Sequence, residues 1–343
     1  MPQLLLVEKP KQMNDQQPAD DPLRVSVPLP FDFVIYPYGM PVRFRTNSDL
    51  VADATHQTWD SWTKRFDSPC VEVRCLVDME SDADNNCSAP PVLRAQGHLL
   101  TIAGSAGNFA CCDLSKAFAF SWITQAVAAD SDYLRFYFLE AMVYSILCTR
   151  DMVFIHAACI ASRGEALLLA GDSGAGKTSL AYACAVKGWT FISDDASVLW
   201  GGESQQVVLG DSRRFRFRDS AAYLFPELSG RPESRQPWRG KPTLEVLSDS
   251  MPIRTAREAR PRHVVFLRRH ADPGRTARLI ELRDTTEAAV RLNSNVWPEE
   301  LGTFERNRLV IERLLTAPAY ELHYCRIEDA VELLSRFLVA ECA

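Results

Sequence analysis

The sequence lacks three features that would assign it to a common class at once. It has no apolar run as long as a membrane span, no excess of basic residues, and no C-x-x-C pair among its cysteines. Without such an apolar run we expect no membrane partner. The formal net charge of −6 disfavours nucleic-acid binding through overall electrostatics, so we expect no nucleic-acid partner either.

The ten cysteines are scattered along the 343 residues, and several stand in apolar segments. This pattern favours buried, reduced thiols in a cytoplasmic protein over a zinc site or a disulfide framework. The first residues contain a short apolar stretch with no basic region before it. We therefore expect no signal peptide and a cytoplasmic location.

The composition, 47% hydrophobic and 24% charged, is typical of a soluble globular protein, and the length suits two domains. Residues 1–22 include a Pro/Gln/Asp-rich stretch and are predicted to be a disordered tail. Residues 23–150 are predicted to form a β-rich α+β domain that recognises the substrate. Residues 151–343 alternate apolar strands with helices and are predicted to form an α/β catalytic domain.

Several segments of the first half favour strands or helices. The strands are expected at 31–36, 42–46, 71–77 and 99–104 and within 109–123, and helices are expected after a cap at Asn47 or Ser48 and from a cap at Ser131 to about residue 150. In the second half, strands are expected in VFIHAACIA, before residue 171, in WTFISDDASVLW, and at 263–270, 277–284 and 319–325. Helices are expected directly after residue 178, at 285–293 and 299–315, and at the C-terminal end. The segment RPESRQPWRGKPT is expected to be flexible.

One segment carries a phosphate-binding pattern. Residues 171–178 read GDSGAGKT and match G-x-x-x-x-G-K-[ST], between an apolar strand and a helical segment. Glycines allow backbone N–H groups to surround phosphate oxygens, the lysine reaches the β- and γ-phosphates, and the threonine hydroxyl can ligate Mg²⁺. The predicted nucleotide-binding residues are Gly171, Asp172, Ser173, Gly174, Ala175, Gly176, Lys177, Thr178 and Ser179.

A pair of acidic residues, Asp194 and Asp195, ends the next apolar segment. An acidic residue at a neighbouring strand end commonly holds Mg²⁺ in nucleotide-binding proteins of this kind. Two adjacent carboxylates can divide the work, one holding the metal and one taking a proton from an attacking hydroxyl. The sequence leaves open which residue has which role, and we predict Thr178, Asp194 and Asp195 as metal ligands.

The span from His156 to Asp195 resembles the catalytic domain of HPr kinase/phosphorylase and its wider relatives, which include tailoring kinases of lasso-peptide biosynthesis. The shared pattern is a His on the strand before the loop, the loop, a short helix ending in Lys-Gly, and a strand ending in Asp-Asp. The resemblance implies a mixed α/β sheet related to that of phosphoenolpyruvate carboxykinase. It also implies transfer of the ATP γ-phosphate to a serine hydroxyl.

The chain departs from the bifunctional members of that family at Ser179, where they carry Glu. Their later Gly/Asn/Arg-rich signature is not recognisable, and their N-terminal domain has no counterpart in residues 25–145. HPr is therefore not assigned as the substrate, and we expect forward transfer from ATP with little phosphate-dependent reversal.

Three basic features have alternative interpretations. His156 is either a group near the phosphates or a strand histidine with a structural role. Strand alternation in RRFRFR places Arg214, Arg216 and Arg218 on one face. That face either meets phosphate or an acidic substrate, or is a solvated surface. Lys241 is interpreted as a surface residue in preference to a group that closes over phosphate.

The sequence therefore predicts an ATP- and Mg²⁺-dependent kinase acting on a peptide, protein or carrier, with Lys177, Asp194, Asp195 and His156 as catalytic residues. The alternatives are a nucleotide-binding regulatory module without turnover and a small-molecule kinase or carboxykinase-like enzyme. The acceptor and the oligomeric state stay open, a homo-oligomer included.

Overall fold

The fold was obtained as a computed structural model. It describes residues 26–79, 89–105, 107–150, 152–200, 206–218, 221–229, 234–238, 241–272, 274–294, 296–297 and 303–341. The predicted tail, residues 1–22, lies outside these ranges. The fold is mixed α/β, with four sheets among the described residues.

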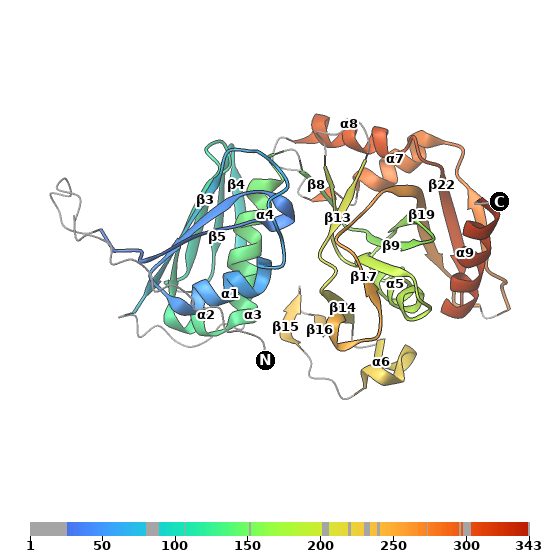
Figure 1. Cartoon of the computed structure of the whole chain (residues 1–343), viewed down its shortest axis with the longest axis horizontal. Helices are drawn as coiled ribbons and strands as arrows, with labels where there is room; N and C mark the ends of the chain where they lie inside the picture. The colour runs from blue at the N-terminus through green and yellow to red at the C-terminus, as the bar shows by residue number, and fades with distance from the viewer. Residues whose placement is uncertain are drawn as a thin grey trace, which may run out of the picture.

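The first sheet has seven strands in the order β1-β2-β3-β7-β6-β5-β4. The strands are β1 (Phe31–Ile35), β2 (Val42–Thr46), β3 (Val71–Asp78), β4 (Val92–Gln96), β5 (Leu99–Ala103), β6 (Phe109–Asp113) and β7 (Phe118–Thr124). The helical segments that follow or interrupt them are η1 (Pro37–Gly39), α1 (Asp49–Trp59), α2 (Gln125–Ala129), α3 (Ser131–Leu134), the π-helix η2 (Arg135–Glu140) and α4 (Ala141–Leu147). In Figure 1, α3 and α4 lie on the side of this sheet that faces the rest of the chain.

The second half is built on another seven-stranded sheet, in the order β17-β11-β9-β10-β19-β22-β20. Its strands are β9 (Ala158–Ser162), β10 (Glu165–Ala170), β11 (Thr190–Ser193), β17 (Arg254–Thr255), β19 (Pro261–Arg269), β20 (Arg278–Glu281) and β22 (Ala319–Tyr324). Strands β10, β19 and β22 are parallel, whereas β9 is antiparallel to β10 and β11. The carboxyl ends of β10 and its parallel neighbours therefore meet at one edge of the sheet.

Helices cover both faces of this sheet. They are α5 (Lys177–Val186), α7 (Thr285–Asn293), α8 (Phe304–Leu314) and α9 (Ile327–Glu341). Alternate residues of β10 separate two cores: Leu167 and Leu169 pack with α5 and α9, and Leu168 packs with α7 and α8. Because β10 is buried on both faces, it presents a continuous apolar run that ends in the glycine-rich loop.

Two smaller sheets connect the halves. One contains β18 (Glu258–Ala259), β13 (Val208–Gly210), β12 (Ser197–Trp200), β8 (Met152–Ile155) and β21 (Val296–Trp297), and the other contains β14 (Arg214–Arg218), β16 (Lys241–Leu247) and β15 (Ser234–Trp238). The short segments α6 (Ala221–Leu224), η3 (Pro226–Leu228) and η4 (Ser248–Ser250) complete the described elements. Phe154, Val198, Val207 and Leu209 pack in the same core as the first sheet and its helices. The apolar contact between the halves is therefore continuous.

The structure corrects four expectations about the elements. VFIHAACIA is two strands in different sheets, because the chain turns between Ile155 and Ala157, where the Ala157 N–H donates to the Ile155 carbonyl at 2.8 Å. The segment expected to be flexible contains β15 and the start of β16, with Lys241 at a strand end. Strand β4 and helix α2 were not predicted.

The fourth correction concerns the helix expected from a cap at Ser131. The cap is Asp130, whose carboxylate accepts the Tyr133 N–H at 3.0 Å, and the helix widens into a π-helix at 135–140. An aspartate is an effective N-cap because its side chain replaces a missing backbone acceptor. Inserted π-helical turns are rare and often accompany functional sites.

Candidate functional site

The glycine-rich loop joins β10 to α5 and depends on three backbone conformations that glycine adopts readily. Gly171, Gly174 and Gly176 have φ angles of +143°, +93° and +97°. A side chain at Gly171 would approach the Leu267 carbonyl oxygen of β19 within 3.1 Å. The three glycines therefore allow a tight loop whose N–H groups lead into the first turn of α5, where Thr178 and Ser179 stand.

Lys177 is the first residue of α5 and is only 6% exposed. Its ammonium curls back over the loop and donates to the carbonyl oxygens of Gly171, at 2.6 Å, and Asp172, at 3.3 Å. Burial lowers the pKa of Lys177 to about 8, against the opposing charges of Asp195 and Asp172. Within the described part of the chain, the hydrogen-bond partners of this ammonium are carbonyl oxygens. A buried cation of this kind is suited to binding an anion.

Strand β22 contacts the glycine-rich loop through Tyr324. The buried hydroxyl of Tyr324 donates to the Ala175 carbonyl at 2.7 Å. A side chain at Gly176 would collide with the same hydroxyl. Tyr324 thus fixes the loop where α5 begins, a residue that the motif alone did not point to.

The two acidic residues follow β11 and occupy different environments. Asp194 is 5% exposed, and its Oδ2 accepts the backbone N–H of Arg216 at 2.6 Å. Burial, with the nearby charge of Asp195, raises the pKa of Asp194 to about 7. This carboxyl group is therefore able to exchange a proton near neutral pH.

Asp195 is more open, with 41% of its side chain exposed. His156 Nδ1 lies 3.1 Å from its Oδ1, and Arg216 Nη1 lies 3.7 Å from its Oδ2. Burial raises the pKa of Asp195, but the hydrogen bond from His156 and the charge of Arg216 outweigh it and bring the pKa to about 2. Asp195 is thus ionised at neutral pH and keeps contact with solvent.

His156 stands in the bend between β8 and β9 and not on the strand before the loop, where the sequence pattern placed it. Its Nδ1 is also 3.0 Å from the carbonyl oxygen of Asp195. The residue therefore contacts the acidic pair, and within the described ranges none of its hydrogen bonds reaches the loop. This contact fits a residue that orients Asp195.

The three arginines of β14 share one face, and Phe215 and Phe217 are buried on the other, as the alternation predicts. Arg214 donates to Glu245 of β16 at 2.8 Å. Arg216 contacts Asp195, Glu140 and Glu245. Arg218 donates to the Ser173 hydroxyl on the loop, and no described carboxylate pairs with it. Among the described residues, this series of arginines therefore ends beside the loop in a cation with no acidic partner.

Sequence reasoning missed two residues of the first half, Arg135 and Glu140. Both belong to the π-helix, and each side chain is 7% exposed. The guanidinium of Arg135 donates to Glu140 at 3.0 Å and to Glu245 at 3.0 Å. Opposite charges five residues apart inside an apolar helical segment were the available signal, since charged residues are seldom buried unless paired.

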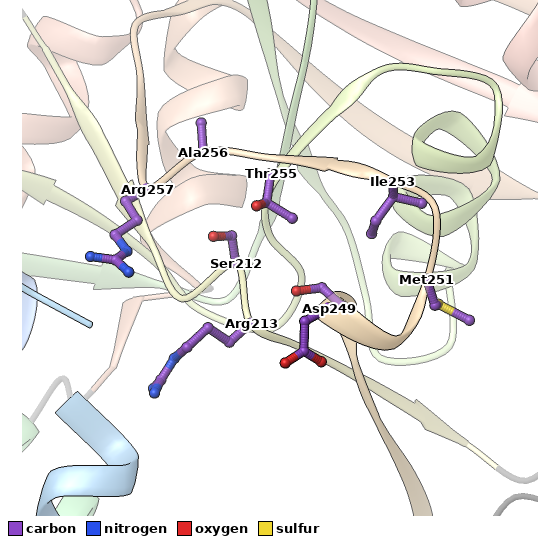
Figure 2. Close-up of a pocket in the computed structure, with 9 residues that line it drawn as sticks. Ser212, Arg213, Asp249, Met251, Ile253, Thr255, Ala256 and Arg257 are labelled. Carbon is purple, nitrogen blue, oxygen red and sulfur yellow. The ribbon is translucent and has the colours of Figure 1, made fainter. Parts of the chain in front are cut away.

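Two cavities lie near these elements. The first, of about 540 Å³, is bounded by Arg213 and Arg257 on one side and Met251 and Ile253 on the other (Figure 2). It does not include the loop. The second, of about 710 Å³, opens beside the loop and is lined by Gly171, Asp172, Gly174, Ala175, Phe266, Leu267, Arg268, Arg269, His270, Arg291, Ser294 and Glu321. This volume is within the usual range for small-molecule sites.

The donor set near the loop fits Mg²⁺ shared with a phosphate ligand. Within the described ranges, no group of three or more His, Cys, Asp or Glu side chains is arranged to hold a metal ion by itself. Mg²⁺ is commonly held by one or two carboxylates together with substrate phosphates. Asp194, Asp195 and the Thr178 hydroxyl are hard oxygen donors of that kind.

No protein-family profile matches the chain, and no curated protein matches it. Among solved structures, the chain is similar to the Hpr(Ser) kinase/phosphatase from Coxiella burnetii at 11% identity and a TM-score of 0.28, over 55% of this chain and 92% of that chain. A likeness this low carries no argument about function. Among the described residues, no helix has the length and apolar character needed to cross a membrane.

Proposed function

We propose that the chain is an ATP- and Mg²⁺-dependent kinase that transfers the γ-phosphate to a serine-type hydroxyl of a peptide, protein or carrier. One observation carries the proposal. A glycine-rich loop with a buried lysine lies within electrostatic reach of an acidic pair whose two pKa values diverge. Diverging pKa values within one site are typical of an acid–base pair with distinct roles.

In this proposal the loop is a P-loop for the ATP phosphates. Its N–H groups and the N-terminus of α5 bind phosphate oxygens, and Lys177 exchanges its carbonyl partners for the β- and γ-phosphates. Arg218 reaches the transferring group from β14, because it already contacts Ser173 and has no described carboxylate to neutralise it. The second cavity gives room for the remainder of the nucleotide.

The acidic pair divides the remaining work. Asp195 is ionised and partly exposed, so it is assigned to Mg²⁺ with the Thr178 hydroxyl, and His156 orients it. Asp194 has a pKa near 7, which suits a residue that accepts the proton of the acceptor hydroxyl. When bound, Mg²⁺ neutralises charge on the β- and γ-phosphates. The domain formed by residues 23–150 is proposed to recognise the acceptor.

Single substitutions of the pair test the proposal. Asp194→Asn is expected to keep Mg·ATP affinity while ATP turnover, followed as ADP release, falls by about 10²–10⁴-fold. Asp195→Asn is expected to weaken Mg·ATP binding by about 10-fold or more. Wild-type turnover in both variants would refute the mechanism. Tight ATP binding without ADP release by the wild-type protein would favour a regulatory module.

A further inference from the structure

The acidic pair is connected to the first half of the chain through one side chain, Arg216. Its guanidinium lies among three carboxylates: Glu140 Oε2 at 3.3 Å, Glu245 Oε2 at 3.5 Å and Asp195 Oδ2 at 3.7 Å. The contact with Asp195 is the longest of the three. The other two carboxylates therefore compete with Asp195 for the same cation.

Glu140 is a strong competitor because it is buried and held. Its side chain is 7% exposed, and Arg135, exposed to the same 7%, donates to it at 3.0 Å. A buried carboxylate between two guanidinium groups has little freedom to move, and its charge is weakly screened by solvent. A second group of the same π-helix also holds Arg216: the ring of Phe136 lies 5.6 Å from its guanidinium carbon.

We propose that Glu140 is a positioning residue of the active site, which holds Arg216 back from Asp195 and so leaves Asp195 Oδ2 available to a divalent cation. This inference rests on the proposed function. It makes the first half of the chain a part of the catalytic site, because residues 135–140 fix the side chain of Arg216, and the backbone N–H of the same residue donates to Asp194. Without Glu140, Arg216 closes onto Asp195, and the cation has to compete with an ion pair.

The test is a Mg²⁺ titration of the binding of a fluorescent ATP analogue to the full-length protein. In Glu140→Gln, the Mg²⁺ midpoint is expected to rise by about 10-fold, the scale of substitutions that touch metal ligands indirectly. Binding of the analogue in EDTA is expected to stay at the wild-type level. Asp132→Asn is the matched control, because it also removes a carboxylate that lies 3.3 Å from Arg135. The Asp132 side chain is 51% exposed and is not among the described carboxylates that pair with Arg216.

Phe136→Leu is a second variant. Unlike Glu140→Gln, it keeps the carboxylate that pairs with the guanidinium groups of Arg135 and Arg216. It removes the ring from Arg216 while keeping an apolar side chain, and a smaller rise of the Mg²⁺ midpoint is expected. If Glu140→Gln does not fold, this variant decides the question. If the folded variants have the wild-type Mg²⁺ midpoint, the role of Glu140 is overturned and the proposed function is unaffected. Failure of the wild-type protein to bind the analogue at any Mg²⁺ concentration overturns the proposed function, and the inference with it.

Discussion

At the residue scale, two neighbouring aspartates with identical side chains have different surroundings in the fold. Asp194 is buried against the Arg216 N–H, and Asp195 faces solvent between His156 and Arg216. Neighbouring residues point in different directions once the chain has left the strand. The sequence predicts that both belong to one site, and that role stays a prediction. The sequence did not indicate which aspartate is buried and which is exposed. That difference depends on contacts with β14, which lies about twenty residues further along the chain.

The raised pKa of Asp194 predicts a pH-dependent cost to stability. A carboxyl group whose pKa rises from about 3.9 to about 7 on folding stabilises the fold fully below pH 4 and loses that contribution as the pH rises to 7. In Asp194→Asn without Mg²⁺, the stability gain over wild type should grow between pH 4 and pH 7, up to about 4 kcal/mol.

Thermal or denaturant unfolding at several pH values measures this gain. Asp53→Asn, at an exposed position of α1, is the control for removal of a surface carboxylate. A constant difference for Asp194→Asn would show that Asp194 titrates normally in the folded protein.

Arg218 is predicted to act on the transferring phosphate and not on nucleotide binding in general. In Arg218→Gln, kcat for ATP turnover should fall by about 10²–10³-fold, the scale for removing one charged stabiliser of the transition state, while KM changes little. Arg218→Lys should recover part of the loss, since it keeps the charge. Equal kcat in wild type and Arg218→Gln would remove Arg218 from the mechanism.

At the element scale, the strand–loop–helix unit was predictable because its signals are local. An apolar run, glycines with positive φ and a helical segment follow one another directly in the chain, and they correspond to β10, the loop and α5. The break in VFIHAACIA was not predictable in the same way. Both of its strands are buried on both faces, so hydrophobicity runs through the turn at His156 without a glycine or proline to mark it.

The contact between Tyr324 and the glycine-rich loop predicts how substitutions at Gly176 and Tyr324 change stability. In Gly176→Ala, the methyl group meets the Tyr324 hydroxyl in a left-handed conformation, which should cost about 2 kcal/mol or more. Adding Tyr324→Phe removes the colliding oxygen, so the double variant should regain part of that stability. Urea unfolding of the single and double variants measures this coupling. Strictly additive effects would mean that the loop and β22 do not interact at this point.

At the scale of the whole molecule, the long-range arrangement was beyond the sequence. The order of the strands, the common core that includes Phe154 and Val198, and the Arg135–Glu140–Glu245 cluster all join segments that are distant in the sequence. Arg135 and Glu245, for example, are 110 residues apart. A further link is Arg213, which donates to the carbonyl oxygens of Gln57, at 2.8 Å, and Thr58. No local pattern encodes such pairs. The boundary near residue 150 stays a prediction, and the structure adds that the two sides of it share apolar and charged contacts.

The central claim is that the loop around Lys177 binds the phosphates of ATP. Isothermal titration of Mg·ATP into wild type, Lys177→Ala and the control Lys187→Ala tests it most directly. Lys187 lies at the opposite end of α5, away from the loop. Wild-type affinity is expected in Lys187→Ala, and a loss of about 10- to 100-fold is expected in Lys177→Ala, because a buried charge that contacts the phosphates is removed. Unchanged affinity and ADP release in Lys177→Ala would contradict it.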